Sequence, residues 1–267
     1  MLVFGTGYYF KAKKATQRGF CSTCGKYSKM TSWSGMSFFH LYFIPIIPIS
    51  SYQRIHKYCS NCNNGLTFPP PKHEEITLKI KEQSAMALLA LQDGEEFVPD
   101  VDDEPTDALS FLEGAADWLY AAKEKEFCLQ FLQQLNRPEC RFAEAMITAF
   151  LYMMDGDLNK SAEHYLLAAK ASPNDYRGHL RAANVLVEQK KLDQAITEYQ
   201  AAAVAAAAEH ADMRVNILYL MADTLTKQKR FLEASKAYDE IVQYRPEYLN
   251  DKEFVKLMNK AKKKAGV

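Results

Sequence analysis

Two Cys-x-x-Cys pairs constrain this chain more than any other feature of its sequence. They read CSTCG at 21–25 and CSNCNNG at 59–65. Each pair makes a tight turn that offers two thiolates, and two such turns complete a tetrahedral structural zinc site. Residue types that tolerate the positive φ of such turns follow the pairs, namely Gly25, Asn63, Asn64 and Gly65. The predicted ligands of a structural Zn²⁺ ion are Cys21, Cys24, Cys59 and Cys62.

The gap between the pairs is 34 residues, which fits a zinc ribbon whose two turns are joined by several strands. Redox pairs are the main alternative, but two would be redundant and no thioredoxin-like βαβ pattern surrounds them. Four thiolates leave no open position for water, so we do not expect catalytic metal. Cys128 and Cys140 are expected to be core or surface residues, and His40 and His56 are not expected to be ligands.

Charge is segregated along the chain although the net charge is zero. Residues 1–70 hold eight basic residues and no Asp or Glu, whereas residues 93–107 hold eight acidic residues and no basic one. Such segregation is typical of separate modules. We expect the acidic run to be a solvated loop, because repulsion and proline oppose compact structure.

The segment FFHLYFIPIIPI at 38–49 is apolar or proline at eleven of twelve positions. It is too short for a membrane-spanning helix, which needs about 20 apolar residues, and Pro45 and Pro48 break helices. It is expected to form strands, with a second apolar face that packs on a helix at 74–91 or stays exposed. We favour packing. The exposed alternative is a membrane or partner surface of Phe38, Phe39, Leu41, Phe43, Ile44, Ile46 and Ile47.

The N-terminal 66 residues resemble a known family. FGTGYYFKAKK, the first cysteine pair, FFHLYFIPIIPI and the second pair together are similar to zinc ribbons of the zinc-ribbon 15 type. A more distant likeness is to the LITAF domain, whose apolar segment between the cysteine pairs inserts at the membrane interface. The segment is shorter here, and the His–Cys spacing in IHKYC is one residue longer. Neither resemblance implies an enzymatic activity.

The C-terminal part repeats. GDLNKSAEHYLLAAKASP at 156–173 superposes on 190–207 and on 229–246. Aromatic and small residues then fall at matching positions: Tyr165, Tyr199 and Tyr238; Ser161, Ala195 and Ala234; Ala149, Ala183 and Ala222. The first two copies are 34 residues apart, and the third follows after 39, with five extra residues in the alanine-rich 201–211 segment. A helix–turn–helix period of 34 residues resembles the tetratricopeptide repeat (TPR). The resemblance implies an array of helix pairs that binds a peptide or protein.

We therefore predict a multi-domain chain, with a small all-β zinc ribbon followed by an all-α, TPR-like helical solenoid. The expected parts are the ribbon at 1–70, a linker helix and acidic loop at 71–106, and repeats at 107–267. The repeats are expected at 107–140 (degenerate, with Trp118 as its aromatic), 142–173, 176–207 and 215–246. A capping helix is expected at 250–264, because the last repeat of a solenoid would otherwise expose its apolar face.

The sequence indicates a non-enzymatic adaptor or scaffold, since it has no glycine-rich phosphate loop and no nucleophile motif. We expect no small-molecule substrate. We expect the protein to lie in the cytoplasm, either free or attached to the surface of a membrane. Docking of the ribbon on an anionic membrane is one alternative function, and nucleic-acid binding is a weaker one. By repeat register, a partner-binding groove would include Phe150, Met153, Arg177, Asn184, Glu188, Tyr219, Asp223 and Lys227.

Overall fold

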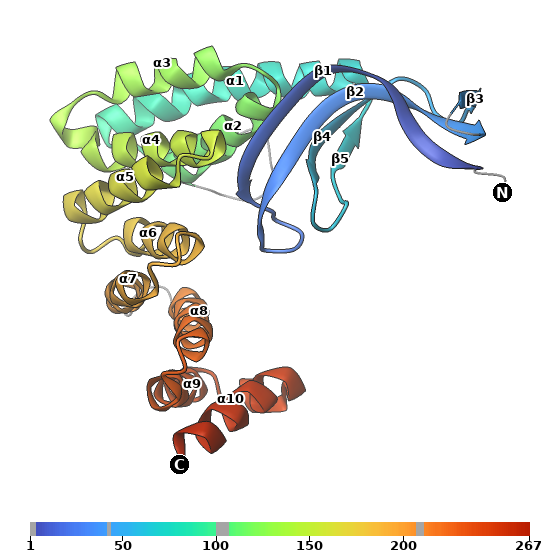
Figure 1. Ribbon diagram of the computed structural model, residues 1–267. Coiled ribbons are helices and arrows are strands. Elements are labelled where there is room, and N and C mark those ends of the chain that lie inside the picture. Colours follow the sequence, from blue (N-terminus) through green and yellow to red (C-terminus); the bar gives the residue numbers. More distant parts are fainter. Residues whose placement is uncertain (1–3, 42–43, 100–106, 207–210) are drawn as a thin grey trace. The chain divides into compact units, whose positions relative to one another are not determined.

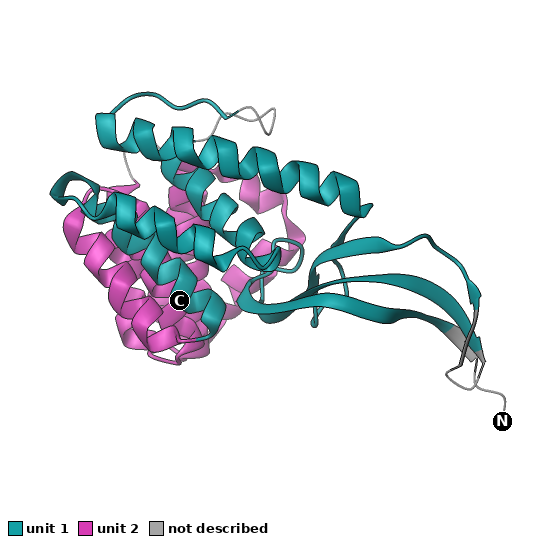
Figure 2. Ribbon diagram, turned by 90° about the horizontal axis from the view of Figure 1, so that it is seen from above, with its two compact units in different colours: residues 1–156 teal, residues 157–267 magenta. Residues whose placement is uncertain are grey.

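The computed structural model describes residues 4–41, 44–99, 107–206 and 211–267. The chain divides into two compact units, Met1–Gly156 and Asp157–Val267 (Figure 2). Unit 1 holds an N-terminal antiparallel sheet and the helices that follow it, and unit 2 is helical (Figure 1). Residues 100–106 of the predicted acidic loop and residues 207–210 lie outside the described part.

The sheet is built around one long strand. Strand β2 pairs with β1 along one edge, with β4 through residues 30–35 on the other edge, and with β3 through residues 38–41. Strand β5 pairs with β4, and every pairing is antiparallel. The strands are β1 Phe4–Phe20, β2 Tyr27–Leu41, β3 Ile44–Pro48, β4 Gln53–Cys59 and β5 Leu66–Phe68. The predicted all-β structure between and around the cysteine pairs is confirmed.

Helices cover one end of this sheet. Helix α1 packs on α2 and contacts β4, while α2 and α4 contact β1 (Figure 1). The helices of unit 1 are α1 Pro70–Asp93, α2 Ala108–Ala121, α3 Lys125–Leu135 and α4 Arg141–Asp155, with a 3₁₀ turn η1 at Pro138–Cys140. The helix predicted at 74–91 is therefore present as the central part of α1.

The division into units differs from the predicted ranges. Unit 1 runs past residue 70 and ends at Gly156, inside the range 142–173 predicted for a repeat. The reason is packing: Tyr27 donates a hydrogen bond to the Met153 carbonyl (3.2 Å), which ties α4 to the strands. Trp118, predicted as the aromatic of a degenerate repeat, instead packs against two histidines of unit 1.

Unit 2 consists of helices that pack on their sequence neighbours. They are α5 Leu158–Ala171, α6 Tyr176–Glu188, α7 Leu192–Ala205, α8 Ala211–Lys227, α9 Phe231–Tyr244 and α10 Lys252–Ala265, with a 3₁₀ turn η2 at Pro246–Asn250. Helix α10 occupies most of the range 250–264 predicted for a capping helix, and its last turn carries Lys262, Lys263 and Lys264. No helix among the described residues is both long enough and apolar enough to cross a membrane.

The residues that define the sequence repeat are all buried. The three tyrosines, the three residues four positions before them and the three alanines are each at most 2% exposed. Small residues at helix contacts let the backbones approach, and each large aromatic fills the space that remains. The burial of all nine positions supports the helix-pair repeat predicted from the sequence.

Gly178 shows how closely two of these helices approach. A Cβ at this position would lie 2.8 Å from the Ala169 backbone nitrogen and 3.0 Å from the Ala169 Cα. Because these are backbone atoms, α5 and α6 would have to move apart. Replacing glycine by alanine gains up to about 1 kcal/mol of helix propensity, but forced overpacking costs about 1–3 kcal/mol.

We therefore expect Gly178→Ala to lower the free energy of unfolding of unit 2 by about 1 kcal/mol, and Gly178→Val by more. Urea titration followed by circular dichroism measures this. Gly114→Ala in α2 is the matched control, because its Cβ would meet no atom within 4 Å and should only gain helix propensity. A Gly178→Ala chain as stable as the wild type would contradict the close approach of α5 and α6.

Candidate metal centre

The structure brings the four predicted cysteines together. Their sulfur atoms all lie within 4.8 Å of one another; the Cys21–Cys62 sulfurs are 3.8 Å apart and those of Cys24 and Cys59 are 4.0 Å apart. Four thiolates around one ion, each at about 2.3 Å, would be separated by about 3.8 Å in an ideal tetrahedron. The donor set therefore fits a four-coordinate metal ion.

Each cysteine pair sits in a turn closed by backbone hydrogen bonds. In the first turn, the Gly25 N–H donates to the Cys21 carbonyl (2.8 Å), and in the second the Asn63 N–H donates to the Cys59 carbonyl (3.0 Å). Gly25 and Asn63 occupy the same position after the second cysteine, and both have positive φ, +64° and +59°. The prediction of left-handed residues is confirmed at these two positions.

Gly65 is required for a different reason than the predicted positive φ. A Cβ there would lie 2.9 Å from the Tyr58 Cα. The chain folds back on strand β4 at this point, so only a residue without a side chain fits. The sequence indicated the glycine, but only the structure shows that the constraint is the approach of two backbones.

Hydrogen bonds around the sulfurs favour ionisation of Cys24 and Cys59, whereas at Cys62 the Asn64 backbone N–H is outweighed by burial and by hydrogen bonds to the other three thiols, which raise the pKa to about 11. The Lys26 backbone N–H lowers the pKa of Cys24, and the side chain of Asn61 lies 3.4 Å from its sulfur. Burial opposes ionisation of Cys59, but the backbone N–H groups of Cys62 and Asn61 outweigh it and lower its pKa to about 6. Negative charge gathered here is stabilised by a bound cation, which a set of four thiolates commonly requires.

A metal bound by all four cysteines would have a closed coordination shell. Structural sites have this arrangement, whereas catalytic sites keep one position for water or substrate. A bound ion would hold together two turns that are separated in the sequence by the 34 residues between Cys24 and Cys59. In the described part of the chain, three or more Cys, His, Asp or Glu side chains come close enough to share a metal ion only at these four cysteines.

A buried pair of histidines lies between the sheet and the helices. His56 of β4 is fully buried, and its Nδ1 lies 3.3 Å from Nε2 of His73 in α1. Trp118 of α2 stacks on both rings, with centroids 4.1 and 5.0 Å away. The packing partners of His56 are therefore His73 and Trp118. No spacing rule could have found a pair contributed by two separate elements.

Burial is the main influence on both histidines. It lowers the pKa of His56 to about 2, with further contributions from Lys57, His73 and Arg54. It also lowers the pKa of His73 to about 4, aided by Arg54 and Lys13. Both rings are therefore neutral at physiological pH.

The apolar segment stays partly exposed, which corrects the preferred prediction. Helix α1 packs on α2 and β4, whereas Ile47 is 57% exposed and the neighbouring Ile49 55%. Phe38 and Phe39 are half-buried, and Phe10 packs edge-to-face on Phe38. Pairing with β2 places β3 beyond the part of the sheet that α1 contacts (Figure 1). Phe43 and the side chains of Leu41, Ile44 and Ile46 lie outside the described part.

The predicted groove residues do not all share one unit. Phe150 and Met153 belong to unit 1, and Met153 is buried, with its terminal methyl near Gly19 of β1. The physical reason is the contact of α4 with the sheet. The other six residues belong to unit 2: Arg177, Asn184, Glu188, Tyr219, Asp223 and Lys227.

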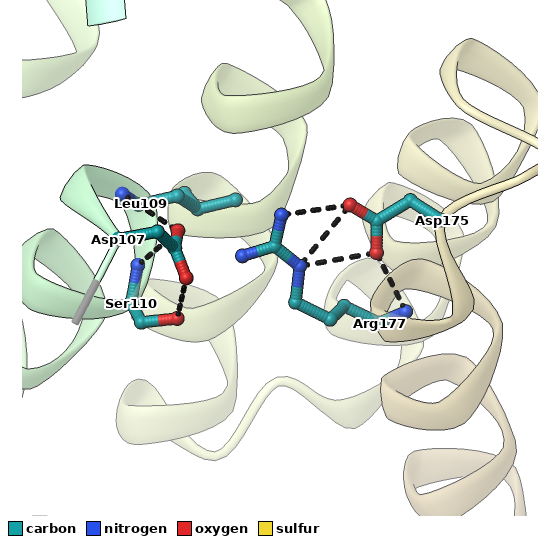
Figure 3. A network of polar contacts seen from close by, with 5 residues as sticks. All are labelled: Asp107, Leu109, Ser110, Asp175 and Arg177. Atoms are coloured by element: carbon teal, nitrogen blue, oxygen red, sulfur yellow. Dashed lines mark hydrogen bonds and ion pairs between the residues drawn. The ribbon is translucent and has the colours of Figure 1, made fainter. Parts of the chain in front are cut away.

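Within unit 2 several of these side chains already have partners. Arg177 binds Asp175 through Nε (3.0 Å) and Nη2 (2.7 Å), at the N-terminus of α6 (Figure 3). Figure 3 also shows the corresponding start of α2, where Asp107 accepts from the backbone of Leu109 and Ser110. Aspartate at these positions satisfies N–H groups that have no partner inside the helix.

The exposed members of the predicted groove carry both charge signs. Lys227 pairs with Asp223 at 2.7 Å, one helical turn apart on α8. Asn184 accepts a hydrogen bond from the buried Tyr199 hydroxyl (2.7 Å). Burial raises the pKa of Glu188, and Lys227 opposes this. The surface therefore has no single-sign character.

The fold and the cysteine cluster define a class: an antiparallel sheet with a candidate metal site, followed by repeated helix pairs. No model of a protein family and no curated protein matches this chain. Among solved structures, the chain is similar to BtubC (BKLC) from P. vanneervenii, with 14% identity, coverage of 74% of this chain and 84% of that chain, and a TM-score of 0.55.

Two further solved structures show weaker likeness. One is the TPR2B domain of yeast Sti1 in a complex with pHsp70 (21% identity, 46% of this chain, 97% of that chain, TM-score 0.38). The other is the MamA RS-1 ArsTM double mutant (19% identity, 70% of this chain, 94% of that chain, TM-score 0.34). Both TM-scores are below 0.5, so the likeness in fold is carried by BtubC.

Proposed function

We propose that this chain is a non-enzymatic adaptor, in which a structural Zn²⁺ holds the sheet and the TPR-like helices bind a segment of another protein. The single observation that carries the proposal is the burial of all nine repeat-defining residues. Because these positions are buried, one side of each repeat helix packs against its neighbours. Exposed polar residues such as Glu188, Asp223 and Lys227 are left on the first helices of the repeats, where TPR-like arrays bind peptides.

Zinc is the metal we assign to the cysteine cluster. Thiolate donors select zinc among the common divalent ions, and a closed set of four cysteines is a structural zinc set. The same set suits iron, which is coloured when bound by thiolates. Metal analysis of the purified chain distinguishes the two ions.

A peptide selected against the full chain tests the adaptor role. We expect selection from a random peptide library to enrich sequences whose affinity falls at least several-fold in the Lys227→Glu chain, since the charge at the groove is reversed. Glu163→Lys in α5 is the control, because it reverses a charge that is also exposed but lies on the second helix of a repeat. Fluorescence anisotropy measures both affinities. Peptides that lose affinity equally for both variants, or no enriched peptide, would contradict the proposal.

Membrane docking is a second candidate, favoured by one observation. Phe10, Ile47 and Ile49 expose more than half of their surfaces, within a region that has eight basic residues and no acidic ones. Apolar side chains among basic residues suit the interface of an anionic bilayer.

We expect the full chain to sediment with vesicles of phosphatidylserine and phosphatidylcholine, and binding to persist at high salt if the apolar residues insert. The chain with Ile47→Ser and Ile49→Ser should lose this salt-resistant fraction. Leu89→Ser is the matched control, because Leu89 on α1 is 58% exposed but lies outside the strands. Equal sedimentation of the two variants would remove the membrane candidate.

A further inference from the structure

A cavity of about 390 Å³ lies in unit 1, away from the cysteines. Strands β1, β2 and β4 form one wall, and α1 and the turn after α2 form the other. Its chemically active side chains are Lys13, Arg54, His73, Glu74, Lys81 and Glu124. Neither the metal site nor the proposed peptide groove uses these residues.

Arg54 is the unusual member of this lining. It is only 4% exposed, and its Nη1 and Nη2 donate to the carbonyls of Lys13 (2.8 Å) and Ala121 (2.7 Å). No ion pair joins Arg54 to a carboxylate in the described part of the chain. Buried charges in proteins are normally paired, because removing an ion from water is costly. This cation therefore lacks a full counter-charge.

Helix α2 supplies part of that counter-charge. Ala121 is its last residue, so its carbonyl carries the negative end of the helix dipole, which is equivalent to about half an elementary charge. This explains why Arg54 is tolerated in the apoprotein. It does not neutralise the guanidinium, which is always protonated and presents five N–H donors.

The two acidic side chains of the cavity are already matched. Glu74 lies 3.9 Å from Lys13, and Glu124 lies 2.9 Å from Lys81. Lys13 and Glu74 are both strongly exposed, so their ion pair is weak and easily exchanged. The remaining net charge of the cavity is that of Arg54.

We propose that this cavity binds an oxyanion of the phosphate or carboxylate class, which completes the charge of Arg54. The guanidinium offers a planar set of donors that matches both groups. Lys13 at the rim would exchange Glu74 for the anion and add a second positive charge. The cavity is larger than one such group, so the anion would be part of a larger ligand, with apolar contacts from Leu78 and Pro70.

Nuclear magnetic resonance of the full zinc-loaded chain tests the site with two probes, inorganic phosphate and acetate, added at constant ionic strength against sodium chloride. We expect saturable shifts at the Arg54 Nε–H and at the amides of His73, Thr77 and Ala122. Saturation by phosphate assigns the phosphate class, and saturation by acetate alone assigns the carboxylate class. Shifts that chloride reproduces, or that stay linear with either probe, would overturn the proposal.

Two variants separate recognition from folding. Lys13→Gln removes a rim charge from a largely exposed side chain and should weaken binding several-fold without loss of the folded spectrum. Lys14→Gln removes the neighbouring charge outside the cavity and should bind as the wild type does. Equal affinity of the Lys13→Gln and Lys14→Gln chains for the anion would overturn the role of the cavity. This comparison does not need Arg54→Met, which removes the buried charge itself and could unfold unit 1.

Discussion

Replacing Cys59 with serine is expected to abolish metal binding and unfold the sheet of unit 1. Cys59 is fully buried beside Cys21 and Met30, and a serine hydroxyl is a poor ligand at neutral pH. Binding of a structural zinc contributes on the order of 10 kcal/mol to folding in small zinc domains. This is comparable to the whole stability of a typical domain, so the sheet should not survive its loss.

Metal content and tryptophan emission measure this result. The chain has two tryptophans, Trp33 and Trp118, and both lie in unit 1. Their emission should therefore shift to longer wavelength in Cys59→Ser, or after chelation of the wild type. Cys140→Ala is the control, because this buried cysteine lies outside the cluster and its replacement should leave the metal bound. Retention of metal and of native emission by Cys59→Ser would show that the four cysteines are not a metal site.

Mild acid should destabilise unit 1 through His56 and His73. A histidine in the unfolded chain has a pKa near 6.5, whereas burial holds the pKa of His56 at about 2 and that of His73 at about 4. Below pH 6.5 the unfolded chain binds protons that the folded chain does not. The contribution of each histidine to the free energy of unfolding is therefore complete above pH 6.5. Below that pH it falls by about 1.4 kcal/mol for each pH unit. Together the pair should cost about 3 kcal/mol at pH 5.5.

Urea unfolding between pH 7.5 and 5.5, followed by tryptophan emission, measures this loss. Metal analysis at each pH is the control, because protonation of the cysteines also releases metal. The histidine ring resonances give a direct test, since those of His56 and His73 should not titrate while the protein stays folded above pH 5.5. Midpoints near pH 6.5 for both rings in the folded chain would contradict the neutral buried pair.

Local patterns allowed the sequence to predict the cluster of four cysteines and the repeat. The two residues between the cysteines of each pair allow one turn to present both sulfurs, so Cys21 and Cys24 needed no knowledge of distant contacts. The repeat is also local, because helical periodicity and small residues opposite Tyr199 and Tyr238 reflect contacts between adjacent helices. These features are encoded within a few tens of residues, where spacing and packing are directly linked.

Contacts between distant segments were not predictable from such patterns. Trp118 has the sequence neighbours of a repeat aromatic, yet it stacks on His56 and His73, which come from β4 and α1. Met153 falls at a groove position by register, yet it is buried where α4 meets the sheet. Ile47 has apolar neighbours on both sides and still remains exposed.

The sequence by itself determined which residues could gather a metal and where the helix pairs recur, since both depend on short-range geometry. The tertiary structure decided which surfaces are covered: it joined the sheet to α1–α4 in one unit, paired the two histidines, and enclosed Arg54 without a carboxylate. Burial depends on which elements meet, and for this chain those meetings join residues more than 100 positions apart, as between Tyr27 and Met153, which are 126 positions apart.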